Sequence, residues 1–342
     1  MEDQTEQKTF VFSNAFELES GAVIPGFQLA YTTMGELNAE KTNVLWVFHA
    51  LTANSNVIEW WPELVGNNKI IDPQKYFIIC VNMPGSCYGS IGPISNNDAV
   101  DSYYHSFPFF TTRDMANAYK LLKDDLGINT IAIGIGGSMG GQQLLEWAII
   151  EPELFKVIVP LATNAKHSPW GIAFNASQRL AIEQDSTWQN KEITAGLQGM
   201  KVARSIALIS YRHYDTYFSS QIDSDEAKLE NYKSESYQRY QGEKLATRFN
   251  AFSYYFLSKS MDAHNVGRNR GSVKTALKKI TAKTLVIGIT TDVLFPVQEQ
   301  VFLFENITDA KIELIDSPYG HDGFLTEGQK INDLILNFIN GN

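Results

Sequence analysis

The segment that most constrains the fold is a glycine-rich turn between an apolar run and a stretch of helical spacing. Residues 130–135 form a β-branched apolar run that predicts a buried strand. Residues 136–140 read Gly-Gly-Ser-Met-Gly and fit the pattern G-x-S-x-G around Ser138. Four apolar residues then recur with helical spacing: Leu144, Leu145, Ala148 and Ile149. A strand, a sharp turn and a helix are the context in which such a serine acts as a nucleophile. The pattern alone also fits a turn whose serine has no chemical role.

Other apolar runs alternate with helical patterns along the chain. The first two runs alternate between apolar and polar residues and predict antiparallel edge strands, whereas the rest are continuous and typical of strands buried on both faces. Helical spacing covers residues 112–126, with Thr112 as the candidate N-cap. This order predicts an α/β fold, a mostly parallel sheet with helices on both faces. The expected strands are residues 9–12, 23–33, 44–48, 76–81, 130–135, 157–162, 284–289 and 311–315.

The alternation of strands and helices is interrupted once. Residues 166–282 are helical, aromatic and polar in pattern, with no convincing buried strand. We therefore expect a discontinuous α/β core of residues 1–165 and 283–342, with residues 166–282 as a helical insertion. A chain of 342 residues is long enough to bury a large core and carry such an insertion.

Charge and composition narrow the class of partner. The formal net charge of −10 argues against nucleic acid as the main partner, because a polyanion needs a basic surface. The two cysteines, Cys80 and Cys87, form neither a CxxC pair nor a metal-ligand spacing, so no metal site is expected. The polar N-terminus lacks the apolar segment of a secretory signal, and no apolar run approaches a membrane span. These features predict a cytoplasmic protein that binds neither nucleic acid nor membrane.

A serine nucleophile needs a base and an acid that orients the base, and both can be sought after later strands. In a hydrolase-type α/β sheet the chain order is serine, acid, histidine. His321 is the only histidine that follows the last strand, in a glycine-flanked loop. Asp292 follows the strand 284–289 and is preferred as the acid over Asp316, which lies on the same loop as His321. Each residue alone is also compatible with a solvated loop.

An acyl-transfer site further needs two backbone N–H groups directed at the developing oxyanion. The residue after the nucleophile, Met139, is expected to supply one. The loop after the strand 44–48 is expected to supply the other, at Leu51. We expect the nearby His49 to be a structural hydrogen-bonding residue at the base of this loop and not a second base.

The insertion of residues 166–282 is expected to supply the residues that determine substrate specificity. Arg204 and Tyr211 are seven residues apart in a predicted helix and therefore share a face with Leu208. An arginine can bind a carboxylate with two hydrogen bonds, and a tyrosine adds a neutral hydroxyl. An arginine at such a position is also commonly a surface or interface residue.

Nearly the whole chain resembles the homoserine O-acetyltransferase family of α/β-hydrolase-fold acyltransferases. The elbow Gly-Gly-Ser-Met-Gly-Gly together with Gly-His-Asp is far more specific than G-x-S-x-G alone. The segments that carry the resemblance are 49–52 (His-Ala-Leu-Thr), 85–93, 107–108, 112–115, 136–141, 173–175, 178–179, 203–204, 240–242, 253–254, 261–262, 292–296 and 319–325.

The resemblance implies a ping-pong reaction in methionine biosynthesis, with acetyl-CoA as co-substrate and no permanently bound cofactor. The acetyl group passes to Ser138 and then to the hydroxyl of L-homoserine, with His321 as base and acid. It further implies that Arg204 holds the homoserine carboxylate, that Tyr211 lies nearby and that Asp322 contacts the amino-acid head group. The insertion would form a lid and the interface of a homodimer.

The chain departs from the family pattern at a few positions outside the triad, several of which are expected near the acyl pocket or the lid. The departures are Ala53-Asn54 after the His-Ala-Leu-Thr segment, Ser86, Asn250 and Gly323. Relatives that use succinyl-CoA, or serine as acceptor, share the same motifs. An esterase or thioesterase, which uses water as acceptor, needs the same triad. The triad therefore cannot separate transfer from hydrolysis, because these two reactions differ in whether the lid excludes water.

Overall fold

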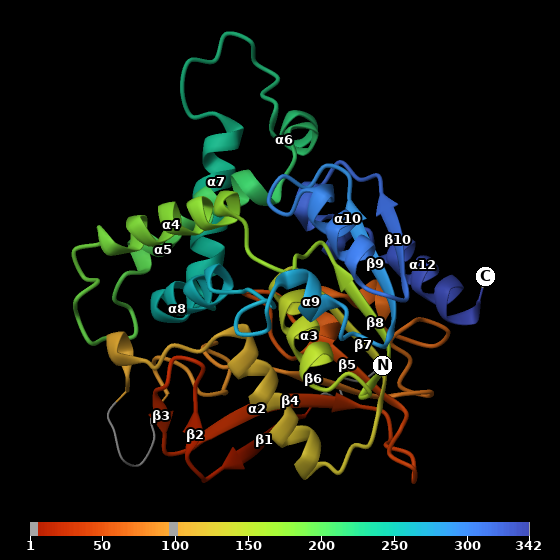
Figure 1. Cartoon of the computed structure of the whole chain (residues 1–342). Coiled ribbons are helices and arrows are strands. Elements are labelled where there is room, and N and C mark those ends of the chain that lie inside the picture. The colour runs from red at the N-terminus through yellow and green to blue at the C-terminus, as the bar shows by residue number, and fades with distance from the viewer. Residues whose placement is uncertain (1–5, 96–101, 342) are drawn as a thin grey trace.

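The computed structural model describes residues 6–95 and 102–341, and its centre is an eight-stranded sheet (Figure 1). The strand order is β1-β4-β6-β5-β7-β8-β9-β10, and β2 and β3 form a separate two-stranded sheet. The pairs from β6 through β10 are parallel, whereas β4 is antiparallel to both β1 and β6. The predicted α/β fold with a mostly parallel sheet is therefore confirmed. The strands are β1 (Gln7–Phe12), β2 (Phe16–Glu17), β3 (Val23–Ile24), β4 (Phe27–Met34), β5 (Val44–Phe48), β6 (Phe77–Val81), β7 (Ile131–Gly137), β8 (Phe155–Leu161), β9 (Lys283–Ile289) and β10 (Ala310–Ile315).

Helices cover both faces of this sheet. Alternate residues of β5 enter two apolar clusters: Trp46 packs with Trp147 of α3, and Val47 lies in the cluster that holds Ile331 of α12. Burial on both faces explains why β5 is apolar at every position. The helices are α1 (Val57–Trp60), α2 (Thr112–Asp125), α3 (Met139–Ile150), α4 (Pro169–Glu183), α5 (Leu197–Tyr211), α6 (Tyr214–Gln221), α7 (Lys233–Ala246), α8 (Ala251–Asp262), α9 (Val273–Leu277), α10 (Val297–Asn306), α11 (Gly323–Thr326) and α12 (Gly328–Asn340), with short 3₁₀ turns η1 (Pro62–Leu64), η2 (Tyr104–Ser106) and η3 (Gly320–Asp322).

The helices between β8 and β9 form a group of their own. In Figure 1, α4, α5, α7 and α8 gather to one side of the sheet. The helix α4 packs against α5 and α8, and α5 also packs against α7 and against the η3 turn after β10. Contact with η3 brings this group to the carboxyl ends of the parallel strands, where ligands bind in open α/β sheets.

Two expectations about the first strands were wrong. Residues 23–33 do not form one strand, because β3 ends before Pro25 and β4 begins at Phe27. Proline cannot donate to a strand ladder, and Gly26 lies so close to the Phe12 carbonyl that a Cβ would approach its oxygen to 2.5 Å. The strand β4 is also not an edge strand, since it pairs with β1 on one side and β6 on the other.

The expected N-cap of α2 was wrong by one residue. Thr111 is the cap: its hydroxyl accepts from the Asp114 N–H at 3.2 Å, and the Asp114 carboxylate accepts from the Thr111 N–H at 2.8 Å. This reciprocal pair is a capping box. The neighbouring Thr112 instead hydrogen-bonds His264, 152 residues away in the sequence, at 2.8 Å.

The turn from β7 into α3 holds Ser138 in a strained backbone conformation. Its φ of 56° and ψ of −126° lie where residues other than glycine rarely occur. The turn is fixed by a hydrogen bond from the Ser138 N–H to the Leu161 carbonyl at 2.9 Å. The strand and helix approach so closely that a Cβ on Gly136 would lie 2.6 Å from the Gly140 carbonyl carbon. This close approach requires glycine at position 136, and a Cβ on Gly140 would meet the Phe48 carbonyl oxygen of β5.

We predict that Thr111→Ala lowers the free energy of unfolding by about 1–2 kcal/mol, because the Asp114 N–H loses its acceptor. Urea unfolding measures the change. The matched control is Thr247→Ala at the end of α7, where the hydroxyl contacts only the Lys244 carbonyl and a change within about 0.5 kcal/mol is expected. Equal stabilities of the two variants would contradict the capping role.

We also predict that Ser138→Gly is more stable than Ser138→Ala by about 1 kcal/mol, because glycine adopts a positive φ without strain. Both variants remove the hydroxyl, so the comparison isolates the backbone. Thermal and urea unfolding give the difference. If the alanine variant is the more stable one, the turn stores no strain.

Candidate functional site

The structure brings Ser138, His321 and Asp292 into one hydrogen-bonded chain. The His321 Nε2 lies 2.9 Å from the Ser138 Oγ, and the His321 Nδ1 lies 2.7 Å from the Asp292 Oδ2. The three residues are only 6%, 3% and 4% exposed, in the order serine, histidine, aspartate. This geometry allows His321 to accept the serine proton while the aspartate stabilises the ring.

The carboxyl ends of three strands of the sheet, β7, β9 and β10, position the three side chains. Ser138 follows β7, Asp292 follows β9 and His321 follows β10, and the carboxyl ends of these parallel strands meet at one edge of the sheet. The second oxygen of Asp292 accepts from the N–H groups of Leu294 and Phe295, both at 2.8 Å. The rejected candidate, Asp316, is exposed and accepts from the Thr290 hydroxyl instead.

Aromatic rings surround the imidazole of His321. Phe295 stacks on it with ring centroids 5.0 Å apart, and Phe324 and Tyr211 lie at 5.2 Å and 5.8 Å. Phe295 and Phe324 are buried. The rings exclude water from the side of the imidazole that they cover, which strengthens the electrostatic interactions inside the site.

The two expected oxyanion donors are backbone N–H groups without an acceptor in the described ranges. Met139 is the first residue of α3, where helical N–H groups have no partner within the helix. Leu51 is buried in the turn that follows β5. The nearby His49 is a hydrogen-bonding residue of the same loop, and burial lowers its pKa to about 4.

Arg204 and Tyr211 lie beside the triad on α5. The Arg204 guanidinium carbon is 5.3 Å from the centre of the Tyr211 ring, and that ring contacts His321. Within residues 6–95 and 102–341, Arg204 has no carboxylate partner and no hydrogen bond. Burial raises the pKa of the Tyr211 hydroxyl, and the charge of Arg204 opposes that rise. A guanidinium that forms no ion pair in the described ranges, with only the Tyr211 ring between it and His321, is suited to an anionic ligand.

Asp322 has an ion-pair partner that sequence reasoning missed. Its Oδ2 lies 2.7 Å from the Nε of Arg212, the residue that ends α5. Burial raises the pKa of Asp322, and the charges of Arg212, Arg204 and His321 oppose the rise. A basic residue at a helix C-terminus is common, so the sequence carried no signal that separates Arg212 from a surface residue.

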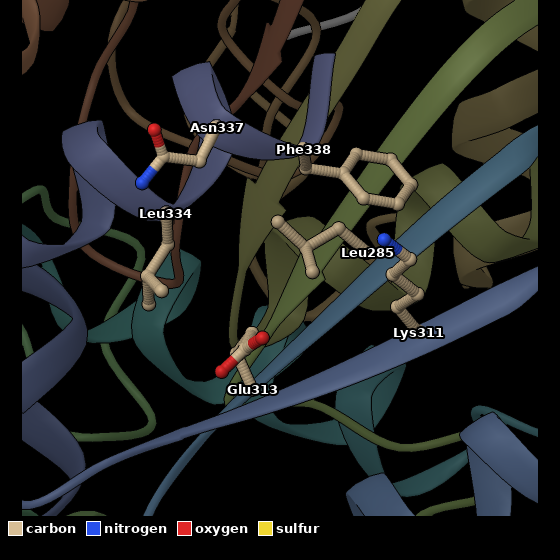
Figure 2. Close-up of a pocket in the computed structure, with 6 residues that line it drawn as sticks. All are labelled: Leu285, Lys311, Glu313, Leu334, Asn337 and Phe338. Atoms are coloured by element: carbon tan, nitrogen blue, oxygen red, sulfur yellow. The ribbon is translucent and has the colours of Figure 1, made fainter. Parts of the chain in front are cut away.

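A separate pocket of about 250 Å³ lies between α12 and the edge of the sheet (Figure 2). Its strand residues lie within β9 and β10, whereas Asp292 and His321 lie in the loops that follow the carboxyl ends of these strands. This pocket is therefore not part of the triad site. Its lining residues are Leu285, Lys311, Glu313, Leu334, Asn337 and Phe338.

A metal-binding cluster and a membrane-spanning helix are both absent from residues 6–95 and 102–341. No group of three or more histidine, cysteine, aspartate or glutamate side chains there is arranged to hold a metal ion. None of the helices in those ranges combines the length and the apolar character needed to cross a membrane.

Comparison with known proteins identifies the family. Residues 43–328 match the family model of the alpha/beta hydrolase fold. The chain is 47% identical over 333 residues to a homoserine O-acetyltransferase of Cyclobacterium marinum, covering 97% of this chain and 95% of that one. A second homoserine O-acetyltransferase, of Chlorobaculum tepidum, is 38% identical and covers 96% and 93%.

Solved structures agree on the fold. A homoserine O-acetyltransferase from Bacillus anthracis superposes with a TM-score of 0.86 at 23% identity, covering 96% of this chain and 97% of that one. An acetylester hydrolase from Corynebacterium glutamicum gives 0.85 at 24% identity, covering 96% and 94%. The fold is thus shared by transferases and hydrolases, whereas the sequence similarity is specific: this chain belongs to the homoserine O-acetyltransferase family of α/β-hydrolase-fold acyltransferases.

Proposed function

We propose that this protein transfers an acetyl group from acetyl-CoA to the hydroxyl of L-homoserine. The observation that carries the proposal is the hydrogen-bonded chain of Ser138, His321 and Asp292 beside an arginine, Arg204, that has no counter-ion in the described ranges. The first feature supports acyl transfer through a serine. The second supports an acceptor that carries a carboxylate.

In the first half-reaction, Ser138 Oγ attacks the thioester carbonyl while His321 Nε2 takes the hydroxyl proton. The carbonyl oxygen becomes an oxyanion, which the N–H groups of Leu51 and Met139 stabilise. The tetrahedral intermediate collapses, the carbon–sulfur bond breaks, and the sulfur of CoA leaves with the proton from His321. Asp292 holds the ring in the correct tautomer throughout.

In the second half-reaction, His321 takes the proton of the homoserine hydroxyl as that oxygen attacks the acyl-serine ester. The same two N–H groups hold the oxyanion. When the bond to Ser138 Oγ breaks, His321 returns the proton to the serine. The product is O-acetylhomoserine, and the enzyme is restored without any permanently bound cofactor.

The acceptor's charges match the two charged groups beside the triad. Arg204 binds the carboxylate of homoserine, and the Tyr211 hydroxyl lies next to it. Asp322 binds the ammonium group through the oxygen that does not face Arg212. Burial raises the pKa of Asp322, and the charge of Arg212 opposes this rise and so favours the charged carboxylate.

We further propose that residues 166–282 form a lid on a core of residues 1–165 and 283–342, and that two copies associate through the lid helices. Several apolar side chains on these helices are more than half exposed: Leu180, Val202, Ile209 and Tyr240. Burying them in a homodimer removes apolar surface from water. We place the enzyme in the cytoplasm, in methionine biosynthesis.

Hydrolysis is the second candidate, because an acetylester hydrolase shares the fold. Its acceptor is water, which needs neither Arg204 nor Asp322.

The decisive experiment follows thiol release from acetyl-CoA and succinyl-CoA, with and without L-homoserine or L-serine. We expect steady release only with acetyl-CoA and homoserine together. Without acceptor we expect a single burst and an added acetyl mass on Ser138, which Ser138→Ala abolishes. Steady release without acceptor would establish hydrolysis instead, and equal rates with serine would overturn the named acceptor.

A second prediction concerns Arg204. We expect Arg204→Ala to raise the KM for homoserine about 10- to 100-fold, because a charged hydrogen-bonded pair is lost, and to leave the acylation burst within about twofold of wild type. Stopped-flow assays measure the acylation burst, and steady-state assays measure the KM for homoserine. Arg239→Ala, an exposed arginine of α7 paired with Glu235, serves as the control and keeps its KM. A slowed burst with an unchanged KM would place Arg204 with the acyl donor.

A further inference from the structure

The peptide unit that joins Ala50 to Leu51 is held by two hydrogen bonds on its oxygen. The Ala50 carbonyl accepts from His49 Nδ1 at 2.9 Å and from the Ala53 N–H at 3.0 Å. A peptide unit is planar, and its N–H points opposite to its carbonyl. Fixing the Ala50 oxygen therefore fixes the direction of the Leu51 N–H, which has no acceptor within the described ranges.

The hydrogen bonds of His49 determine its tautomer. The Met83 N–H points at His49 Nε2 at 3.0 Å, and an N–H group can only donate, so Nε2 carries a lone pair. The proton is therefore on Nδ1, which faces the Ala50 carbonyl. Burial supports this neutral form by lowering the pKa of His49 to about 4. The ring connects the Leu51 peptide to the chain after β6.

A side chain from the region between β8 and β9 holds the same loop from the opposite direction. Arg248, between α7 and α8, donates from Nη1 to the Thr52 carbonyl and to the Tyr88 hydroxyl, the latter at 2.7 Å. No carboxylate pairs with Arg248 in the described part of the chain, so its donors are directed at neutral groups. The loop is also held from α3, where the Gln143 amide donates to the His49 carbonyl at 3.4 Å.

We propose that His49 and Arg248 are positioning residues that direct the Leu51 N–H at the oxyanion, with Arg248 making this direction depend on the lid. The inference rests on the proposed function, because it gives Leu51 the oxyanion role. Donation from Nδ1 also polarises the Ala50–Leu51 peptide and makes its N–H a stronger donor. The hydrogen bonds of both residues go to this loop and to the chain after β6, so we expect their effect to be exerted through the loop.

The test uses the full-length enzyme and four variants of these two residues. His49→Ala removes both ring hydrogen bonds, whereas His49→Asn keeps an amide N–H at the position of Nδ1. Arg248→Met keeps much of the side-chain bulk without the charge, and Arg248→Lys restores a cationic donor. The readouts are the rate of Ser138 acylation, the KM for acetyl-CoA, and the affinity for a trifluoromethyl ketone analogue of acetyl-pantetheine, whose serine adduct carries an oxyanion.

We expect His49→Ala to slow acylation about 10- to 100-fold, by analogy with the loss of one oxyanion donor, and Arg248→Met to slow it about 10-fold. In both variants we expect the KM for acetyl-CoA to stay within about twofold of wild type, and the affinity for the ketone to fall by the same factor as the rate of Ser138 acylation. His49→Asn and Arg248→Lys each recover part of both losses. Arg239→Met on α7 is the matched control. We expect it to change neither the acylation rate nor the affinity for the ketone, since the Arg239 guanidinium pairs with Glu235 and with no other group in the described ranges.

Two outcomes overturn the inference. One is a His49→Ala enzyme that acylates at the wild-type rate. The other is a slowed enzyme whose affinity for the ketone is unchanged, which would mean that the oxyanion site is intact. If His49→Ala does not fold, the variants Arg248→Met, Arg248→Lys and His49→Asn test the inference instead, again by comparing the acylation rate with the affinity for the ketone. Failure of the proposed function has a different signature, since the wild-type enzyme would then release thiol without acceptor or not at all.

Discussion

The strained backbone at Ser138 is the constraint on which the rest of the site depends. A residue other than glycine stays at a φ of 56° only where the surroundings hold it there. Here the Ser138 N–H is bound to the Leu161 carbonyl of the next strand, and its own carbonyl accepts from the Thr163 hydroxyl at 2.7 Å. The buried helix α3 begins at the following residue. The turn places Ser138 between β7 and α3, and the N–H of Met139, the first residue of α3, has no partner within the helix. One turn therefore carries both the proposed nucleophile and one proposed oxyanion donor.

The parallel sheet and the helices above it contribute different parts of the site. The ends of β7, β9 and β10 carry the triad, whose relative positions follow from strands packed on both faces. The helices between β8 and β9 carry the charges that suit an amino-acid acceptor. Arg204 is left without a counter-ion, while Arg212 neutralises one side of Asp322. Because an acetylester hydrolase from Corynebacterium glutamicum shares the fold, the core alone does not distinguish transfer from hydrolysis, and we propose that these helices hold the charged acceptor.

Contacts between these two parts are polar as well as apolar. Arg248 reaches the loop after β5, Trp170 of α4 donates to the Val293 carbonyl next to Asp292, and the Thr216 hydroxyl of α6 donates to the Pro318 carbonyl before His321. Each contact ends on the backbone of a loop that carries a proposed functional group. Motion of the helices would therefore displace the oxyanion donor, the acid and the base together.

The amino-acid sequence by itself determined the α/β fold, the strand 44–48 and the order in which Ser138, Asp292 and His321 follow strands of the sheet. These features follow from local patterns: apolar runs predict buried strands, glycines predict a tight turn, and the order of residues along the chain predicts which strand each one follows. Only the tertiary structure decided that Thr111 and not Thr112 caps α2, that β4 lies inside the sheet, and that Arg212 and Arg248 meet Asp322 and Thr52. The physical reason is that the partner of a side chain depends on how distant segments pack together. Arg248 and Thr52, for example, are 196 residues apart in the sequence. Residue type and spacing do not indicate which distant group will lie beside a given side chain.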